Sequence, residues 1–100
     1  MSEHNLHASP SADEVQAALS AALAPLELAV TDDSHLHAGH AGALEGRHFS
    51  VRLVSARFEG LSRLARHRLV YDALASWMQN GIHALALTTL TPTEASRSAP

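Results

Sequence analysis

The sequence predicts a single α+β domain in which helices cover a three-stranded mixed sheet. The chain has 100 residues, which is the size of one domain. Two short apolar runs, 26–30 and 48–54, are separated from a third, 82–90, by a stretch with helical periodicity. The first two strands are expected to form a hairpin, whereas a strand, helix and strand in one sheet predict a parallel pair.

The predicted domain spans 12–92. Residues 1–11 are polar and predict a flexible N-terminal tail, and 93–100 are expected to form a flexible C-terminal tail after Pro92. The N-terminus lacks a basic region followed by an apolar one, and the apolar runs are too short to cross a bilayer. We therefore expect a cytoplasmic protein without a membrane partner.

The first predicted helix has a signal at each end. Ser11 or Asp13 can cap its start, and Pro25 ends it. The alternating run 26–30 then predicts a strand, which the polar residues 31–34 are expected to break.

A long loop and a second strand follow. Residues 35–46, HLHAGHAGALEG, are too rich in small side chains to pack a core, so they predict a long mobile loop. The run 48–54 alternates apolar and polar side chains, which predicts a half-buried strand.

The second helical stretch begins after Ser62, a plausible cap, and ends at Asn80-Gly81, as one helix or as two. Arg66 projects into the apolar side of this stretch, so it must be paired or lie at an edge. The last run, 82–90, is apolar on both faces, which favours an inner strand.

The composition excludes several chemistries. The chain has no cysteine, so any thiolate ligand must come from a partner. Neither a nucleophile motif nor a phosphate-binding loop occurs, and the carboxylates form no acid–base pair. We therefore expect a protein that is not an enzyme.

All seven basic residues are arginines, and most of them are clustered. The members of the cluster are Arg47, Arg52, Arg57, Arg63, Arg66 and Arg68. Such a cluster can form one positive surface for DNA or an acidic partner, although the net charge of the chain is −3. The alternative is a set of solvated surface arginines.

The eight histidines suggest a metal-binding role. His37 and His40 lie close in the sequence, but a loop can present them in any direction. His83 stands at the start of an apolar strand, where it is either a ligand or a histidine satisfied by one hydrogen bond. His67 can simply form a hydrogen bond within its helix. One or two histidines leave a metal incompletely ligated, which indicates a site shared with a second protein.

Four segments together resemble the BolA family: DDSHLHAGHAG, HFSVRLVSARFEG, RHRLVYDALA and IHALALTTLTP. The resemblance implies an αββααβ domain similar to the type II KH fold. It also implies a monothiol glutaredoxin as partner, with a two-iron two-sulfur cluster shared between that protein, glutathione and this chain. His83 matches the family's ligand at the start of the last strand, and His40 matches the loop ligand, with His37 as the alternative. No cofactor is expected in the isolated chain.

The resemblance leaves a second function open, because some family members are described as transcriptional regulators that act on DNA. Arg57, Arg63, Arg66 and Arg68 would then contact phosphates, with His67 beside them. KH domains clamp single strands with a GxxG loop, but Gly60 is not followed by a second glycine. A third reading is an interaction module without a cofactor, as a monomer or a weak homodimer.

Overall fold

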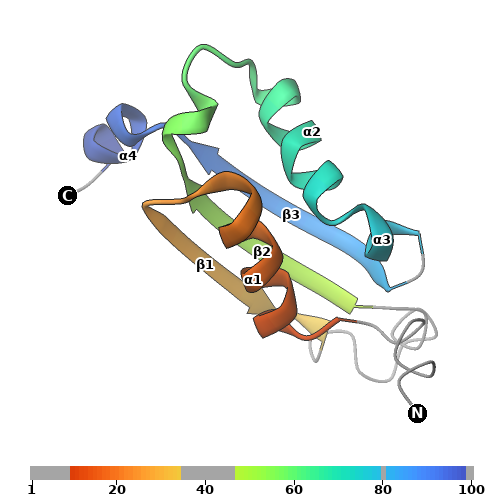
Figure 1. Ribbon diagram of the computed structural model, residues 1–100. Helices are drawn as coiled ribbons and strands as arrows, with labels where there is room; N and C mark the ends of the chain where they lie inside the picture. Colours follow the sequence, from red (N-terminus) through yellow and green to blue (C-terminus); the bar gives the residue numbers. More distant parts are fainter. Residues whose placement is uncertain (1–9, 35–46, 80, 99–100) are drawn as a thin grey trace.

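The computed structural model describes residues 10–34, 47–79 and 81–98, and these form a three-stranded sheet with two long helices on one face (Figure 1). The elements in chain order are α1 (Ala12–Leu23), β1 (Glu27–Asp32), β2 (Arg47–Val54), the short 3-10 helix η4 (Ala56–Phe58), α2 (Arg63–Ala73), α3 (Ala75–Met78), β3 (Ile82–Leu90) and α4 (Pro92–Ser98). The predicted α+β class is confirmed, and the second helical stretch is broken into α2 and α3.

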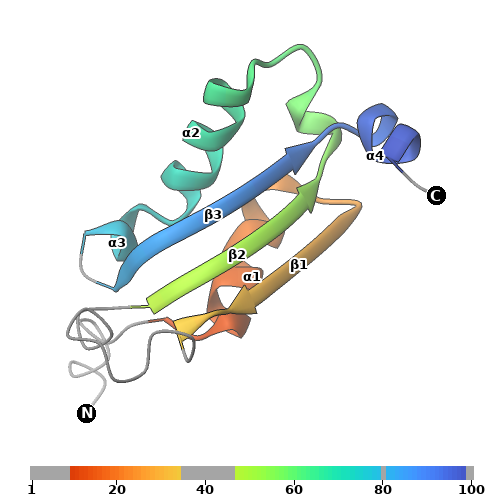
Figure 2. The same cartoon turned by 180° about the vertical axis from the view of Figure 1, so that it is seen from behind.

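The sheet has the order β1-β2-β3, with β2 in the centre. β1 pairs with β2 in the antiparallel direction and β3 pairs with β2 in the parallel direction, as predicted. The prediction that 82–90 forms an inner strand was wrong, because β3 lies at an edge of the sheet. Ala84, Ala86 and Thr88 lie on the exposed face of β3, but they are small side chains. The sequence therefore shows little difference in polarity between the exposed face and the face that packs against the helices. Figure 2 shows this open face of the sheet from behind.

The core lies between β2 and the helices. α1 contributes Val15, Leu19 and Leu23, β2 contributes Phe49, Val51 and Leu53, and the segment from η4 onward contributes Phe58, Val70, Leu74 and Ile82. Each fully buried apolar side chain of this size stabilises the fold by roughly 1.5–3 kcal/mol. One buried polar contact joins the layers, since Ser55 Oγ donates to the Leu23 carbonyl at 2.7 Å.

α1 begins with a reciprocal cap. Ser11 Oγ accepts from the Glu14 N–H at 3.1 Å, and the Glu14 carboxylate accepts from the Ser11 N–H at 2.8 Å. Pro10 is fully buried, so the last residues of the predicted tail 1–11 belong to the fold. Residues 1–9 lie outside the described part of the chain.

β1 extends further than predicted. Its pairing with β2 continues to Asp32 opposite Phe49, so 31–34 do not break the strand where expected. A polar strand end costs little here, because the side chains of Thr31 and Asp32 are not buried. The predicted loop 35–46 lies outside the described residues.

The prediction of a flexible tail over 93–100 was wrong for most of that segment, because α4 occupies Pro92–Ser98. Thr91 and Glu94 cap this helix reciprocally: Thr91 Oγ1 accepts from the Glu94 N–H, and Glu94 Oε1 accepts from the Thr91 N–H. Proline at the first helical position supports the start of the helix rather than ending the structure. The pattern T-P-T-E is the sequence signal for this start.

Candidate metal centre

The parallel pairing of β2 and β3 places the starts of both strands at one edge of the sheet. His48 and His83 are each the second residue of their strand. Their ring centroids lie 5.1 Å apart, with the ring planes tilted by 44°. Two imidazoles from distant parts of the chain therefore meet at this edge, and we call His48 and His83 the histidine pair.

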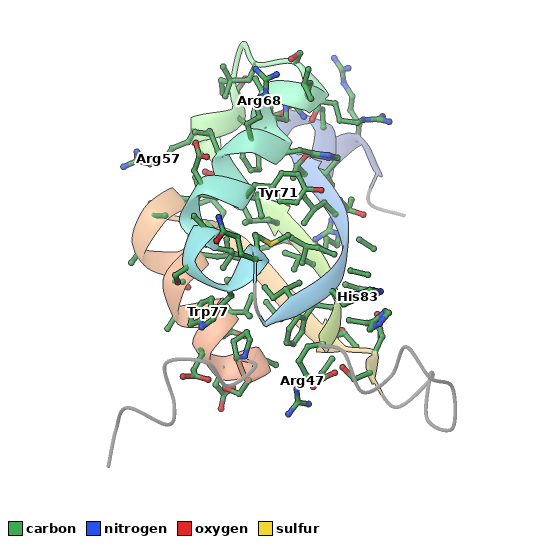
Figure 3. All side chains as sticks on the ribbon, turned by 90° about the vertical axis from the view of Figure 1, so that its right-hand side faces the viewer. Arg47, Arg57, Arg68, Tyr71, Trp77 and His83 are labelled. Atoms are coloured by element: carbon green, nitrogen blue, oxygen red, sulfur yellow. The ribbon has the colours of Figure 1, made fainter. Side chains whose placement is uncertain are left out.

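A β-bulge presents His83. Arg47 pairs with Ile82 and His48 with Ala84, so His83 is an extra residue in β3 without a partner in the register. The side chains of Ile82 and His83 then separate, since Ile82 joins the core and His83 is exposed. Figure 3 shows the His83 ring at the surface, on the same end of the molecule as Arg47. Bulges of this kind re-aim side chains and are frequent beside functional sites.

The backbone of His48 is held by the end of β1. Its N–H donates to Ser34 Oγ at 3.0 Å, and its carbonyl accepts from the Asp33 N–H at 2.7 Å. Asp33 also bonds the hydroxyl of Ser50, two residues further along β2. The Asp-Asp-Ser sequence thus fixes the position of His48, a residue that the sequence analysis did not select.

An ion pair joins the start of β2 to the end of β1. The Arg47 guanidinium donates to Asp32 Oδ2 at 2.9 Å, and the Ser34 N–H donates to Asp32 Oδ1 at 2.9 Å. Hydrogen bonding from Ser34 and the positive charge of Arg47 hold the pKa of Asp32 below its ordinary value. The carboxylate therefore stays ionised and keeps the first residue of β2 attached to β1.

The donor set suits a shared metal or cluster. Within 10–34, 47–79 and 81–98, no group of three or more histidine, cysteine or acidic side chains is arranged to hold a metal ion. The histidine pair offers two imidazoles, and in Rieske centres two imidazoles replace the two thiolates on one of the two irons. Any thiolate ligand of such a site would have to come from another molecule, because the chain has no cysteine. The predicted ligands His40 and His37 lie outside the described residues.

The predicted basic cluster divides into arginines that form ion pairs and arginines that remain exposed. The paired ones are Arg47, Arg52 and Arg66. Arg57, Arg63 and Arg68 are exposed, and none of them forms an ion pair with any described residue. Arg57 and Arg68 lie toward the opposite end of the molecule from His83 (Figure 3). His67 is half-buried and faces the end of β3 beside Arg63. These side chains are therefore remote from the histidine pair.

Arg66 is used inside the fold, as its place on the apolar side of α2 requires. Its side chain is only 12% exposed and binds both oxygens of Glu94, at 2.6 and 3.2 Å. It also donates to the carbonyls of Leu61 and Thr89, and its guanidinium lies 5.9 Å from the centre of the Phe58 ring. The Arg66 hydrogen bonds and the Thr91 N–H lower the pKa of Glu94 to about 2. Arg66 is therefore not available in this state as a phosphate contact.

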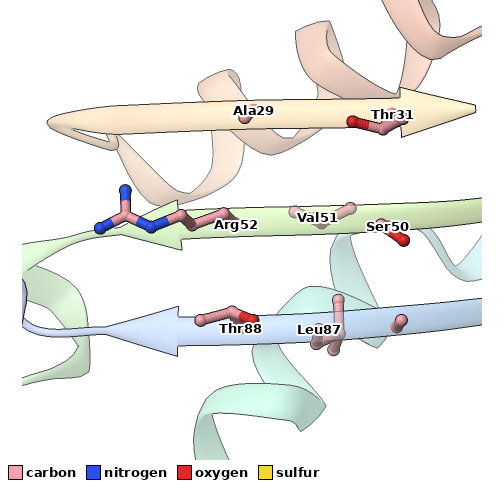
Figure 4. Close-up of a pocket in the computed structure, with 8 residues that line it drawn as sticks. Ala29, Thr31, Ser50, Val51, Arg52, Leu87 and Thr88 are labelled. Carbon is pink, nitrogen blue, oxygen red and sulfur yellow. The ribbon is translucent and has the colours of Figure 1, made fainter.

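The open face of the sheet carries a shallow depression of about 230 Å³ (Figure 4). It is lined by small or polar side chains of the three strands, among them Ala29, Ser50, Ala86 and Thr88. Arg52 stands at its border and pairs with Glu27 at 2.5 Å. Among the residues that the structure describes, no titratable pair or ligand cluster lines it, so the histidine pair remains the centre with the clearest chemistry.

These features define a small α+β domain with an imidazole pair at the shared start of two parallel strands. The family model described as BolA-like protein matches residues 19–94, and the chain belongs to the BolA-like family.

The chain is 47% identical over 77 residues to Protein BOLA1, chloroplastic, of Arabidopsis thaliana, and the match covers 72% of this chain and 48% of that protein. It is 46% identical over 79 residues to SufE-like protein 1 of the same plant, covering 72% of this chain and 21% of the relative. The chain thus spans about half of the first relative and about a fifth of the second.

Solved structures agree with the fold. A bol-like protein from Babesia bovis is 38% identical, with a TM-score of 0.75 and coverage of 88% of this chain and 92% of that one. BolA1 from Arabidopsis thaliana is 40% identical, with a TM-score of 0.74 and coverage of 92% and 98%. Among the described residues, none of the helices has the length and apolar character that crossing a membrane requires.

Proposed function

We propose that this chain binds a monothiol glutaredoxin and shares with it a two-iron two-sulfur cluster that glutathione also ligates. The role would be iron–sulfur cluster assembly or transfer, or iron regulation, and the chain itself would act as a binding partner without enzymatic activity. Membership of the BolA-like family is consistent with an iron–sulfur role. The expected cytoplasmic location remains a prediction.

The observation that carries the proposal is the exposed His83 on its bulge, with the His48 ring beside it. An exposed imidazole at a rigid strand start can reach a metal held by another protein, and its orientation is preset by the sheet. Imidazole ligation raises the potential of a two-iron cluster relative to ligation by thiolates alone. The chain therefore contributes the nitrogen ligands, whereas the glutaredoxin and glutathione contribute the sulfur ligands.

The second ligand from this chain has three candidates. The family resemblance favours His40, with His37 as the alternative, and the structure adds His48 because its ring contacts that of His83. Single alanine variants at the three positions separate them. Loss of the second ligand changes the cluster spectrum, whereas loss of a neighbouring histidine leaves the spectrum as in the wild type.

The experiment is anaerobic cluster reconstitution of the chain with a monothiol glutaredoxin and glutathione, followed by visible absorption and circular dichroism. We expect a spectrum that differs from that of the glutaredoxin alone and that is lost in His83→Ala. Gln16→Ala is the control, because it removes an exposed polar side chain of α1, outside the histidine pair. An unchanged spectrum in His83→Ala, or no spectral difference with the wild type, would refute the proposal.

DNA binding is the alternative function, and Arg57, Arg63 and Arg68 favour it, because they are exposed and form no ion pair with a described residue. The ion pair between Arg66 and Glu94 counts against DNA binding, because the charge of this arginine is already neutralised. Binding through these arginines would weaken steeply with salt, and each lost phosphate contact would reduce the slope by about one unit. A salt titration of a DNA duplex with wild type and Arg68→Gln therefore tests it.

A further inference from the structure

The outer edge of β3 forms a groove with α2, remote from the histidine pair. The groove has a volume of about 300 Å³. It is lined by Arg63 and His67 of α2 and by Leu87, Thr88, Thr89 and Leu90 of β3. Figure 2 shows α2 running beside this edge of the sheet, where the described part of the chain adds no fourth strand. We call this the α2–β3 groove.

The strand edge in this groove offers backbone hydrogen bonds. The Leu90 carbonyl points toward β2, since it accepts from the Ser55 N–H at 3.0 Å, and the Thr89 carbonyl points outward, since it accepts from Arg66 at 3.1 Å. Backbone groups alternate along a strand, so those of Leu87 point outward like those of Thr89. In the part of the chain that the structure describes, no hydrogen bond uses the outward N–H and carbonyl of Leu87.

The charge of the groove is positive. Arg63 and His67 are its only ionisable lining residues among those described, and no carboxylate lines it. The two side chains lie one helical turn apart, about 6 Å along the axis. Alternate side chains of an extended strand are separated by about 7 Å, so two carboxylates on one face of a strand match this spacing.

A buried hydroxyl gives independent support for a polar ligand. Thr89 lines the groove and is only 8% exposed, yet its Oγ1 has no hydrogen-bond partner among the described residues. Buried hydroxyl groups without a partner are uncommon in folded proteins. None of the described residues that line the groove is an aromatic side chain on which bases would stack, which favours a peptide over a single-stranded nucleic acid.

We propose that the α2–β3 groove binds an extended acidic segment of a partner protein, which adds a fourth strand to the sheet beside β3. The backbone of the segment pairs with the outward groups of Leu87, and its carboxylates contact Arg63 and His67. This mode of recognition takes affinity from backbone hydrogen bonds and specificity from alternate side chains. The groove is separate from the histidine pair, so the two sites can be occupied together.

The test is fluorescence anisotropy of the full chain with a fluorescein-labelled octapeptide of alternating glutamate and threonine. We expect saturable binding, with Arg63→Glu weakening it about tenfold because an attraction becomes a repulsion. Arg68→Glu is the matched control, since it makes the same charge change on α2 outside the groove, and it should leave the affinity unchanged. The same peptide methylated at every backbone nitrogen should lose binding, because neither of its edges can donate to β3.

Several outcomes would overturn the proposal. These are the absence of binding at millimolar peptide, equal affinities for Arg63→Glu and Arg68→Glu, or unchanged binding of the methylated peptide. Tighter binding of a labelled oligothymidylate, lost in Arg63→Glu, would assign the groove to nucleic acid instead. A chain that sediments as a dimer until Leu87→Pro separates it would assign the edge to a second copy.

Discussion

At its first residues β3 carries an exposed histidine on a bulge, whereas at its last residues it is bound to the rest of the molecule by an internal ion pair. His83 has a ring contact with His48 and no role in the core. Arg66 instead joins α2, the end of β3 and α4 through Glu94 and the Thr89 carbonyl. One end of the strand is therefore available for chemistry, while the other end stabilises the fold, and each role can be disturbed separately.

The largest effect on stability is expected for Phe58→Ala, near the end of β3 that Arg66 holds. Phe58 is fully buried beneath the Arg66 guanidinium, so its loss removes apolar contacts and leaves a cavity. We expect the free energy of unfolding to fall by about 3–5 kcal/mol, measured by urea denaturation. Phe58→Leu should cost less, because it fills part of the same space. A loss of under about 1 kcal/mol for Phe58→Ala would show that this end of the core is not as tightly packed as described.

Arg66→Met is expected to have the next largest effect. The variant keeps the apolar stem but removes the bonds to Glu94 and to the carbonyls of Leu61 and Thr89. Bonds from a charged donor are stabilising, so we expect a loss of about 2 kcal/mol in the free energy of unfolding. Arg63→Met, an exposed change on the same helix, provides the control. Equal stabilities of the two variants would contradict the internal role of Arg66.

A smaller, pH-dependent effect is expected at Glu94. Its pKa is lowered from 4.5 to about 2 in the folded chain, so the folded state favours the ionised carboxylate more than the unfolded state does. This contribution is fully present above pH 4.5 and is lost as the pH falls toward 2. The stability difference between wild type and Glu94→Gln should therefore shrink over that interval in urea titrations at successive pH values. A difference that does not vary with pH would exclude the ionised pair as its source.

The smallest stability effect is expected for His83→Ala. The side chain is exposed and lies outside the core, so the free energy of unfolding should change by less than about 0.5 kcal/mol. Urea denaturation beside the Phe58→Ala variant provides the direct contrast between the two ends of β3. A loss comparable to that of Arg66→Met would mean that His83 is a structural residue, and the cluster proposal would lose its premise.

Elements with a strong local pattern were predictable from the sequence. β2 alternates Phe49, Val51 and Leu53 on its buried face, and a strand with one covered face shows its period directly. The placement of Arg66 on the apolar side of α2 likewise required a partner, and Glu94 is that partner. The partner does not follow from the sequence pattern, because Pro92 predicts the end of the domain and Glu94 lies beyond it.

The candidate site was only half predictable. His83 stands out because a polar ring begins an apolar strand, but His48 looks like an ordinary flanking residue of β2. Its proximity to His83 depends on the register of two strands that are far apart in the sequence, and on one extra residue in β3. Neither the register nor the extra residue can be recognised in a local sequence pattern, because a bulge shifts the pairing of two strands without changing their composition.

The parallel pairing of β2 and β3 determines when the histidine pair can form. His48 and His83 are contributed by strands that α2 and α3 separate in the chain, so the two rings meet only when β3 has paired with β2. A nascent chain that has not yet released β3 holds no imidazole pair, and neither does an unfolded one. A ligand that needs both rings would therefore load only onto finished molecules, and by mass action it would protect those molecules from unfolding.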